Sequence, residues 1–170
     1  MIALGRFATA GSTEVDWIRP VDGTLGVLSG TLVETSRGWR RVEYLDRFSK
    51  LYTYDGELRQ IVGLQRGSLG NDGSMVVCVP GGKLNVCQDL LLLPDQPILV
   101  GSRGGQDGRG KLCLAKHLCG RWGVRAARLP RGTTVFQLAF EEEELIYANT
   151  GALIYCPATK MPKRSFFESW

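Results

Sequence analysis

Short runs of alternating apolar and polar residues, separated by turn-forming residues, make up most of the chain. Along residues 31–36, odd-numbered positions face one way and even-numbered positions the other, a period of two that is typical of a half-buried strand. A turn at Ser36-Arg37-Gly38 follows, then a returning strand that ends in Val42-Glu43, and then a third strand closed by Asp55-Gly56. The pattern predicts a meander of short strands.

Later segments extend this pattern. Strands are expected over 58–67 and 74–80, separated by a turn at 70–73, whereas the glycine-rich segment 101–110 indicates a loop. The chain has 170 residues, of which 44% are hydrophobic, so it can bury the core of one domain. Its 22 glycines and 7 prolines favour many turns. We therefore expect an all-β fold with little helix.

The order of several motifs resembles the opening block of the Hint domain, the self-cleaving module of Hedgehog proteins, inteins and related bacterial proteins. Gly30-Thr31, Gly38, Val42-Glu43, Leu45 and Asp55-Gly56 stand in the register of that block. Four later segments resemble further blocks of the family, in the same order along the chain: 88–100, 111–120, 133–140 and 141–151.

The resemblance covers roughly residues 26–156 and implies a horseshoe of short strands with pseudo-two-fold symmetry. Residues 1–25 then form an ordered leader before the domain, and residues 157–170 form a basic, aromatic tail. In an active relative, self-cleavage or splicing through an ester or thioester would release what precedes the nucleophile. Whether this chain does so depends on its residues at the family's reactive positions.

Those reactive positions have all lost their reactive groups, if the resemblance is followed residue by residue. Gly26 stands where the family has its nucleophile, and a glycine has no side chain to attack the preceding carbonyl. Leu93 replaces a hydroxyl residue, while Gln96, Gln137 and Glu143 replace histidines. Glutamine does not titrate near neutral pH and cannot act as a general acid. We expect a catalytically inactive domain that serves as a structural or protein-interaction module.

Two other functions remain open at this stage. The nucleophile could have moved to Ser29 or Thr31, which would leave an autoproteolytic domain with a displaced hydroxyl, although no histidine stands nearby in the sequence to activate it. The formal net charge of +4 would also permit a weak anion or nucleic-acid binder, without the concentrated basic stripe of a typical nucleic-acid binder. The arginines considered for that role are Arg59, Arg66, Arg103, Arg109, Arg125 and Arg128.

The spacing of the metal-ligating residue types gives no zinc pattern. The one histidine, His117, lies two residues before Cys119 with no spaced partners, and no two cysteines form a C-x-x-C pair. We expect no metal and no cofactor, and mostly buried, reduced thiols at the five cysteines, Cys78, Cys87, Cys113, Cys119 and Cys156. The run Glu141–Glu144 is interpreted as a solvated turn.

The remaining expectations concern partners and location. Phe166, Phe167 and Trp170 in the tail favour contact with a protein partner or with a second copy, and the leader offers another such surface. No window is apolar and long enough to cross a bilayer, and no signal peptide opens the sequence. We therefore expect a cytoplasmic protein that does not bind membranes.

Overall fold

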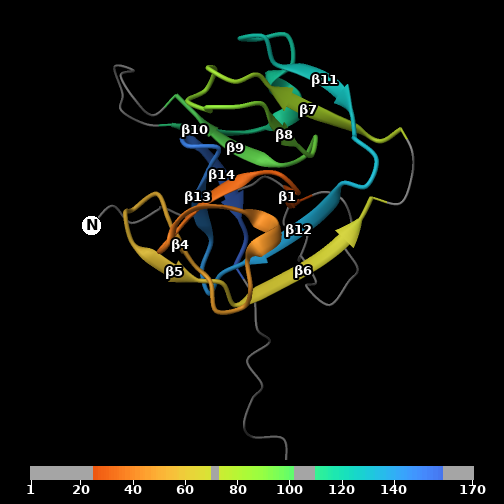
Figure 1. Cartoon of the computed structure of the whole chain (residues 1–170). Helices are drawn as coiled ribbons and strands as arrows, with labels where there is room; N and C mark the ends of the chain where they lie inside the picture. Colours follow the sequence, from red (N-terminus) through yellow and green to blue (C-terminus); the bar gives the residue numbers. More distant parts are fainter. Residues whose placement is uncertain (1–24, 70–72, 102–109, 159–170) are drawn as a thin grey trace, which may run out of the picture.

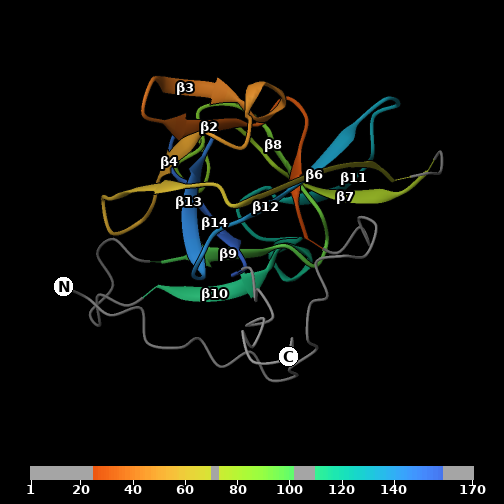
Figure 2. The same ribbon diagram turned by 90° about the horizontal axis from the view of Figure 1, so that it is seen from below.

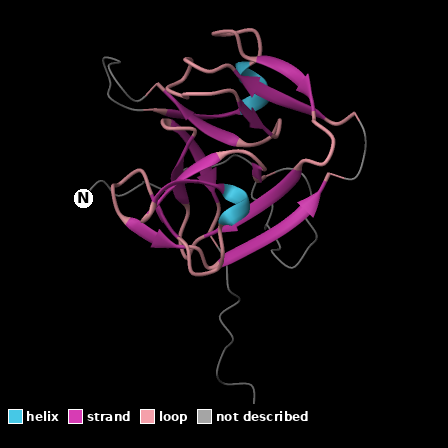
Figure 3. Cartoon of the chain, in the orientation of Figure 1, coloured by secondary structure: helices cyan, strands magenta, loops and turns pink. Residues whose placement is uncertain are grey.

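Two curled β-sheets form the computed structural model, which describes residues 25–69, 73–101 and 110–158 (Figure 1). The first sheet has the strand order β11-β7-β8-β1-β12-β6. The second has the order β10-β9-β14-β13-β2-β4-β5, with β3 attached to β2. Apart from strands, the described residues contain two short 3₁₀ turns, η1 (Val42–Tyr44) and η2 (Ala115–Leu118) (Figure 3). The all-β prediction is confirmed.

The strands are short, as the alternating pattern indicated. Those of the first sheet are β1 (Val27–Leu28), β6 (Gly63–Ser68), β7 (Met75–Val79), β8 (Leu90–Leu92), β11 (Arg125–Arg128) and β12 (Thr134–Ala139). Those of the second are β2 (Leu32–Thr35), β3 (Gly38–Arg41), β4 (Lys50–Tyr52), β5 (Leu58–Gln60), β9 (Pro97–Val100), β10 (Lys111–Leu114), β13 (Glu144–Ala148) and β14 (Ala152–Cys156).

The predicted hairpin at the start of the domain is confirmed, with one correction. Thr31, Val33 and Thr35 are buried, as the period of two required. The returning strand β3 ends at Arg41, however, and the next residues form η1 instead of continuing as a strand. Because η1 turns the chain, Val42 reaches the core while its N–H still bonds to the carbonyl of Thr31 at 2.9 Å.

One large apolar cluster fills the space between the two sheets. It contains side chains from both of them, including Leu51, Ile146 and Ile154 of the second sheet and Val79 and Leu138 of the first. Burying each such side chain contributes about 1.5–3 kcal/mol. A smaller cluster lies on the first sheet. These contacts fix the relative position of the two sheets, on which the geometry described below depends.

The two predicted contact surfaces, the leader and the C-terminal tail, fall almost entirely outside the described residues. Phe166, Phe167 and Trp170, and all of the leader except Leu25, lie outside the described residues. None of the described helical segments has both the length and the apolar character that crossing a membrane requires.

Candidate functional site

The peptide bond between Leu25 and Gly26, called the junction below, lies just before the first residue of β1 in the first sheet. β1 is the inner strand between β8 and β12, and Val27 is paired with Leu92 on one side and with Phe136 on the other. Both pairings are antiparallel, so the next position along β1, Gly26, is opposite Leu93 and Gln137. Residues far apart in the sequence are therefore brought to one peptide bond by strand register.

Two glutamine side chains hold that peptide bond. The N–H of Gly26 donates a hydrogen bond to Oε1 of Gln96 at 3.0 Å. The carbonyl oxygen of Leu25 accepts one from Nε2 of Gln137, also at 3.0 Å. Gln137 comes from β12 of the first sheet, and Gln96 from the turn that leads into β9 of the second. Both polar groups of the bond are thus satisfied by side chains that do not titrate near neutral pH.

Gln96 is fixed in one orientation by its other contacts. Its side chain is buried, with 1% exposure, and its Nε2 donates to the carbonyls of Pro97 at 3.1 Å and Tyr155 at 2.8 Å. Because both N–H groups of the amide are directed at carbonyls, only the oxygen can face Gly26. Gln96 therefore presents an acceptor to the nitrogen of the junction. An acceptor cannot supply the proton that a leaving amine requires.

Gly26 has no room for a side chain. Its φ is +148°, and a Cβ built on it would lie 2.5 Å from Cγ1 of Val135 and 3.1 Å from the carbonyl oxygen of Phe136. Real Cβ atoms do not approach other atoms as closely as 2.5 Å. A nucleophilic side chain at this position would require movement of a fully buried neighbour. The backbone conformation is suited to glycine.

Leu93 and Glu143 do not contribute reactive groups to the junction. Leu93 is 1% exposed and belongs to the smaller apolar cluster, together with Leu28, Val76 and Val135. Glu143 is exposed and accepts a hydrogen bond from the hydroxyl of Tyr155 at 2.9 Å. Its connection to the junction is indirect, since the backbone carbonyl of Tyr155 is one of the acceptors that orient Gln96.

Ser29 and Thr31, the alternative nucleophiles, have structural contacts. The hydroxyl oxygen of Ser29 accepts a hydrogen bond from the N–H of Thr134 at 3.0 Å, which ties the turn after β1 to β12. Thr31 is 4% exposed, and its carbonyl accepts the bond from Val42 described above. His117, the one histidine of the chain, is exposed on η2. No hydrogen bond connects it to either hydroxyl in the described part of the chain.

The interpretation of Glu141–Glu144 as a solvated turn was wrong for its last residue. Glu144 is 6% exposed at the start of β13, with Arg59 Nε 3.5 Å from its Oε1. Burial, and next the charge of Asp55, raise the pKa of Glu144 to about 7, while Arg59 lowers it. The sequence contains a signal for this burial, because the apolar run Leu145–Ala148 follows Glu144 directly and β13 begins at this glutamate.

The arginines considered for anion binding do not form one surface. Arg59 on β5 pairs with Glu57 at 2.7 Å, with Asp55 at 3.3 Å and with Glu144. Arg66 on β6 donates to the carbonyl of Leu45 and lies over the ring of Phe136. Two more lie on β11, at the other edge of the first sheet from β6, and these are Arg125 and Arg128. Arg103 and Arg109 are outside the described residues.

The five cysteines are free thiols, and their burial differs from the prediction. Cys78 and Cys156 are buried and Cys113 is half-buried, but Cys87 and Cys119 are exposed. Burial raises the pKa of the Cys78 and Cys113 thiols. Within the described ranges, no three metal-ligating side chains gather closely enough to hold an ion.

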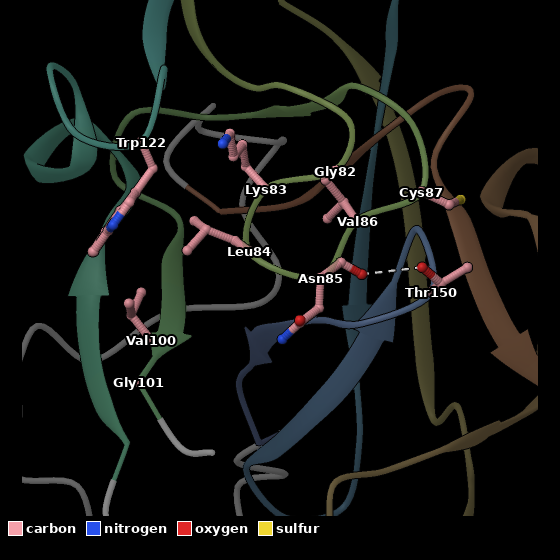
Figure 4. Close-up of a pocket in the computed structure, with 10 residues that line it drawn as sticks. All are labelled: Gly82, Lys83, Leu84, Asn85, Val86, Cys87, Val100, Gly101, Trp122 and Thr150. Carbon is pink, nitrogen blue, oxygen red and sulfur yellow. Dashed lines mark hydrogen bonds between the residues drawn. The ribbon is translucent and has the colours of Figure 1, made fainter. Parts of the chain in front are cut away.

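An open groove of about 590 Å³ lies at the far end of β9 from Gln96 (Figure 4). The loop 82–87 forms one wall, and Val100, Gly101, Trp122 and Thr150 complete the lining. The hydroxyl of Thr150 donates to the carbonyl of Asn85 at 3.1 Å, which connects two parts of the lining. Lys83 is the one charged side chain among these lining residues, so the groove offers no acid and base pair. It includes none of the residues at the junction.

A family model and one solved structure agree with this architecture. A family model described as the Hint domain matches residues 25–153. The solution structure of a bacterial intein-like domain from Clostridium thermocellum is similar, with a TM-score of 0.50 and 11% identity over 76% of this chain and 97% of that one. A GSH-linked, splice-inactive variant of the AceL NrdHF class 3 split intein gives a TM-score of 0.40 and 12% identity, over 79% and 98%. No curated protein matches the chain.

Proposed function

The chain belongs to the Hint-domain family, and from that premise we propose that it is a member without self-cleaving activity, which serves as a structural or protein-interaction module. The observation that carries this proposal is the Leu25–Gly26 peptide bond, held by Gln96 and Gln137 with no side chain at residue 26.

Self-cleavage through an ester or thioester has three requirements at the junction. It needs a nucleophile next to the carbonyl, a proton donor for the leaving nitrogen, and a donor for the oxygen that becomes negatively charged. Gln137 can fill the third role, because its Nε2 already donates to the carbonyl of Leu25. The first role is vacant at Gly26, and Gln96 presents the wrong group for the second. One stabilising donor alone does not cleave an amide.

The same contacts suit a domain that keeps its leader attached. The bond from Gln137 fixes the carbonyl of Leu25, the last residue of the leader, and the bond to Gln96 fixes the N–H of Gly26, so the scaffold sets the orientation of the peptide bond between them. A partner that binds the leader, or the tail at residues 157–170, would then be held at a defined position relative to the two sheets. This is the interaction role that we propose.

Intact-mass measurement of the full chain tests the proposal. The purified protein is incubated at neutral pH with and without a strong thiol or hydroxylamine, which cleave the esters and thioesters of active relatives. We expect the mass of the 170-residue chain to remain unchanged in both. A loss that corresponds to residues 1–25 would overturn the proposal. In that case Ser29→Ala and Thr31→Ala would show whether a displaced hydroxyl is responsible.

A further inference from the structure

β3 is an exposed edge strand on the outside of the molecule. It pairs with β2, and all four of its residues are exposed. Figure 2 shows the β2–β3 hairpin on the opposite side of the domain from β10. Edge strands carry N–H and C=O groups that can pair with another chain, and proteins usually cover or shorten them. The described residues include no element that covers the outer side of β3.

The register identifies which backbone groups are available. The N–H of Val42 bonds to the carbonyl of Thr31, so Thr31 and Val42 form a hydrogen-bonded pair. Val33 and Arg40, two residues away on each strand, form the next hydrogen-bonded pair. In an antiparallel ladder, hydrogen-bonded pairs alternate with pairs whose backbone N–H and C=O groups face away from the partner strand. Trp39 and Arg41 therefore direct their N–H and C=O groups to the outer side of β3.

The side chains of the hairpin make this edge positively charged. Arg40 and Arg41 are exposed, and no carboxylate of the described chain forms an ion pair with them. The nearest acidic residues in sequence form no ion pair with either arginine, although Glu34 lies on the neighbouring strand β2, opposite Trp39. Glu43 accepts a hydrogen bond from the N–H of Gly30 at 2.8 Å, and Asp46 accepts bonds from two residues of its own turn. Arg37, in the turn before β3, adds a third positive charge.

An apolar anchor lies between these charges. Trp39 has 37% of its surface exposed, and side chains alternate along a strand, so it shares one face with Arg41 while Arg40 lies on the other. A strand added at this edge would contact an aromatic ring and arginines on both faces. Acidic side chains would complement the arginines, and one apolar side chain would pack on the ring.

We propose that β3 binds an extended acidic segment of a partner protein, which adds as an antiparallel or parallel strand next to Trp39 and Arg41. Backbone hydrogen bonds to the edge supply part of the affinity, and the arginines select for glutamate or aspartate on both faces of the added strand. The assignment rests on the interaction role proposed above. Its test is made on the intact chain, so that the mass of the same sample reports separately on the junction.

Fluorescence anisotropy with a labelled seven-residue peptide, six Glu with one Val at the centre, tests the proposal. We expect Arg40→Glu/Arg41→Glu to weaken binding at least tenfold. The matched control is Arg125→Glu/Arg128→Glu, which reverses the same number of charges on β11, another exposed edge strand, and should leave binding unchanged. A peptide of the same sequence that is N-methylated at every residue should lose binding, because neither of its edges can then donate hydrogen bonds to the strand.

Amide hydrogen exchange supplies the residue-level readout. On peptide binding, the N–H groups of Trp39 and Arg41 should become protected, while that of Arg40, already paired with Val33, should change little. Equal loss of affinity in both double variants, unchanged affinity for the methylated peptide, or no protection at Trp39 and Arg41 would each overturn the assignment. Full displacement by inorganic polyphosphate together with absent protection would instead indicate a general anion surface.

Discussion

Adding a methyl group at Gly26 should destabilise the domain strongly. The φ of +148° is unfavourable for any residue with a Cβ and costs about 1–3 kcal/mol. The new Cβ would also lie 2.5 Å from Cγ1 of Val135, which is fully buried, and overpacking of this kind costs about 1–3 kcal/mol more. Gly26→Ala should therefore lose roughly 2–6 kcal/mol, a large share of the roughly 5–15 kcal/mol that stabilises a typical domain.

Urea unfolding followed by circular dichroism measures this loss, and Gly30→Ala is the control. Gly30 also has a positive φ, +89°, but a Cβ there would meet no atom within 4 Å. Its substitution therefore isolates the backbone contribution, and the excess loss at Gly26 is the steric part. Val135→Ala should reduce that excess, and the double-mutant cycle should show a coupling of about 1 kcal/mol or more.

The same position tests the chemistry. Gly26→Cys restores a thiol, but the side chain has no space and the nitrogen of the junction still faces the oxygen of Gln96. We expect its mass to remain intact with added thiol. If Gly26→Ala were as stable as Gly30→Ala, or if Gly26→Cys released the leader, the account of a junction closed to a side chain would be refuted.

Four further substitutions test polar groups that are buried or half-buried. Gln96→Leu should cost roughly 3 kcal/mol or more in urea unfolding, because it leaves an N–H and two carbonyls without their partner, whereas Gln137→Leu, at a half-buried position with one such bond, should cost about 1 kcal/mol. Glu144 has its pKa raised from 4.5 to about 7 in the folded state, so ionisation opposes folding and stability should fall, by about 3 kcal/mol at most, as pH rises from 4.5 to 7. Glu144→Gln should abolish that fall between unfolding curves at pH 5 and pH 8, and an unchanged pH dependence would contradict the assignment. Asn149→Ala should cost about 2–4 kcal/mol, since the side-chain amide bonds the N–H of Leu32 and the carbonyl of Asp89, and normal stability would show that water replaces it.

Much of the fold could be predicted from the sequence because strand periodicity is a local property. Whether a residue faces in or out of a strand depends on its neighbours at i−2 and i+2, so the alternation of residues 31–36 and the run 74–80 were sufficient to place β2 and β7. The turn η1 was missed since Val42-Glu43 continues an extended pattern in sequence. Only the packing of Val42 into the core shows that the chain turns there.

The sequence by itself also determined which atoms the junction lacks. Glycine has no nucleophile and glutamine does not titrate near neutral pH, and these are properties of the residues in any conformation. Their geometry was a matter of tertiary structure. Antiparallel register placed Gln137 opposite Gly26, and contact with the second sheet oriented Gln96 so that its oxygen meets the N–H of Gly26.

Only the tertiary structure decided which charged side chains are buried and which form ion pairs. Glu143 and Glu144 are adjacent and chemically identical, yet one is exposed beside Tyr155 and the other is buried against Arg59. Glu43 and Asp46, which follow β3, accept hydrogen bonds from Gly30 and from Phe48 and Ser49. Within the described residues, Arg40 and Arg41 form no ion pair with a carboxylate. Burial and pairing depend on residues distant in sequence, and a local pattern carries no information about which of those residues will be near.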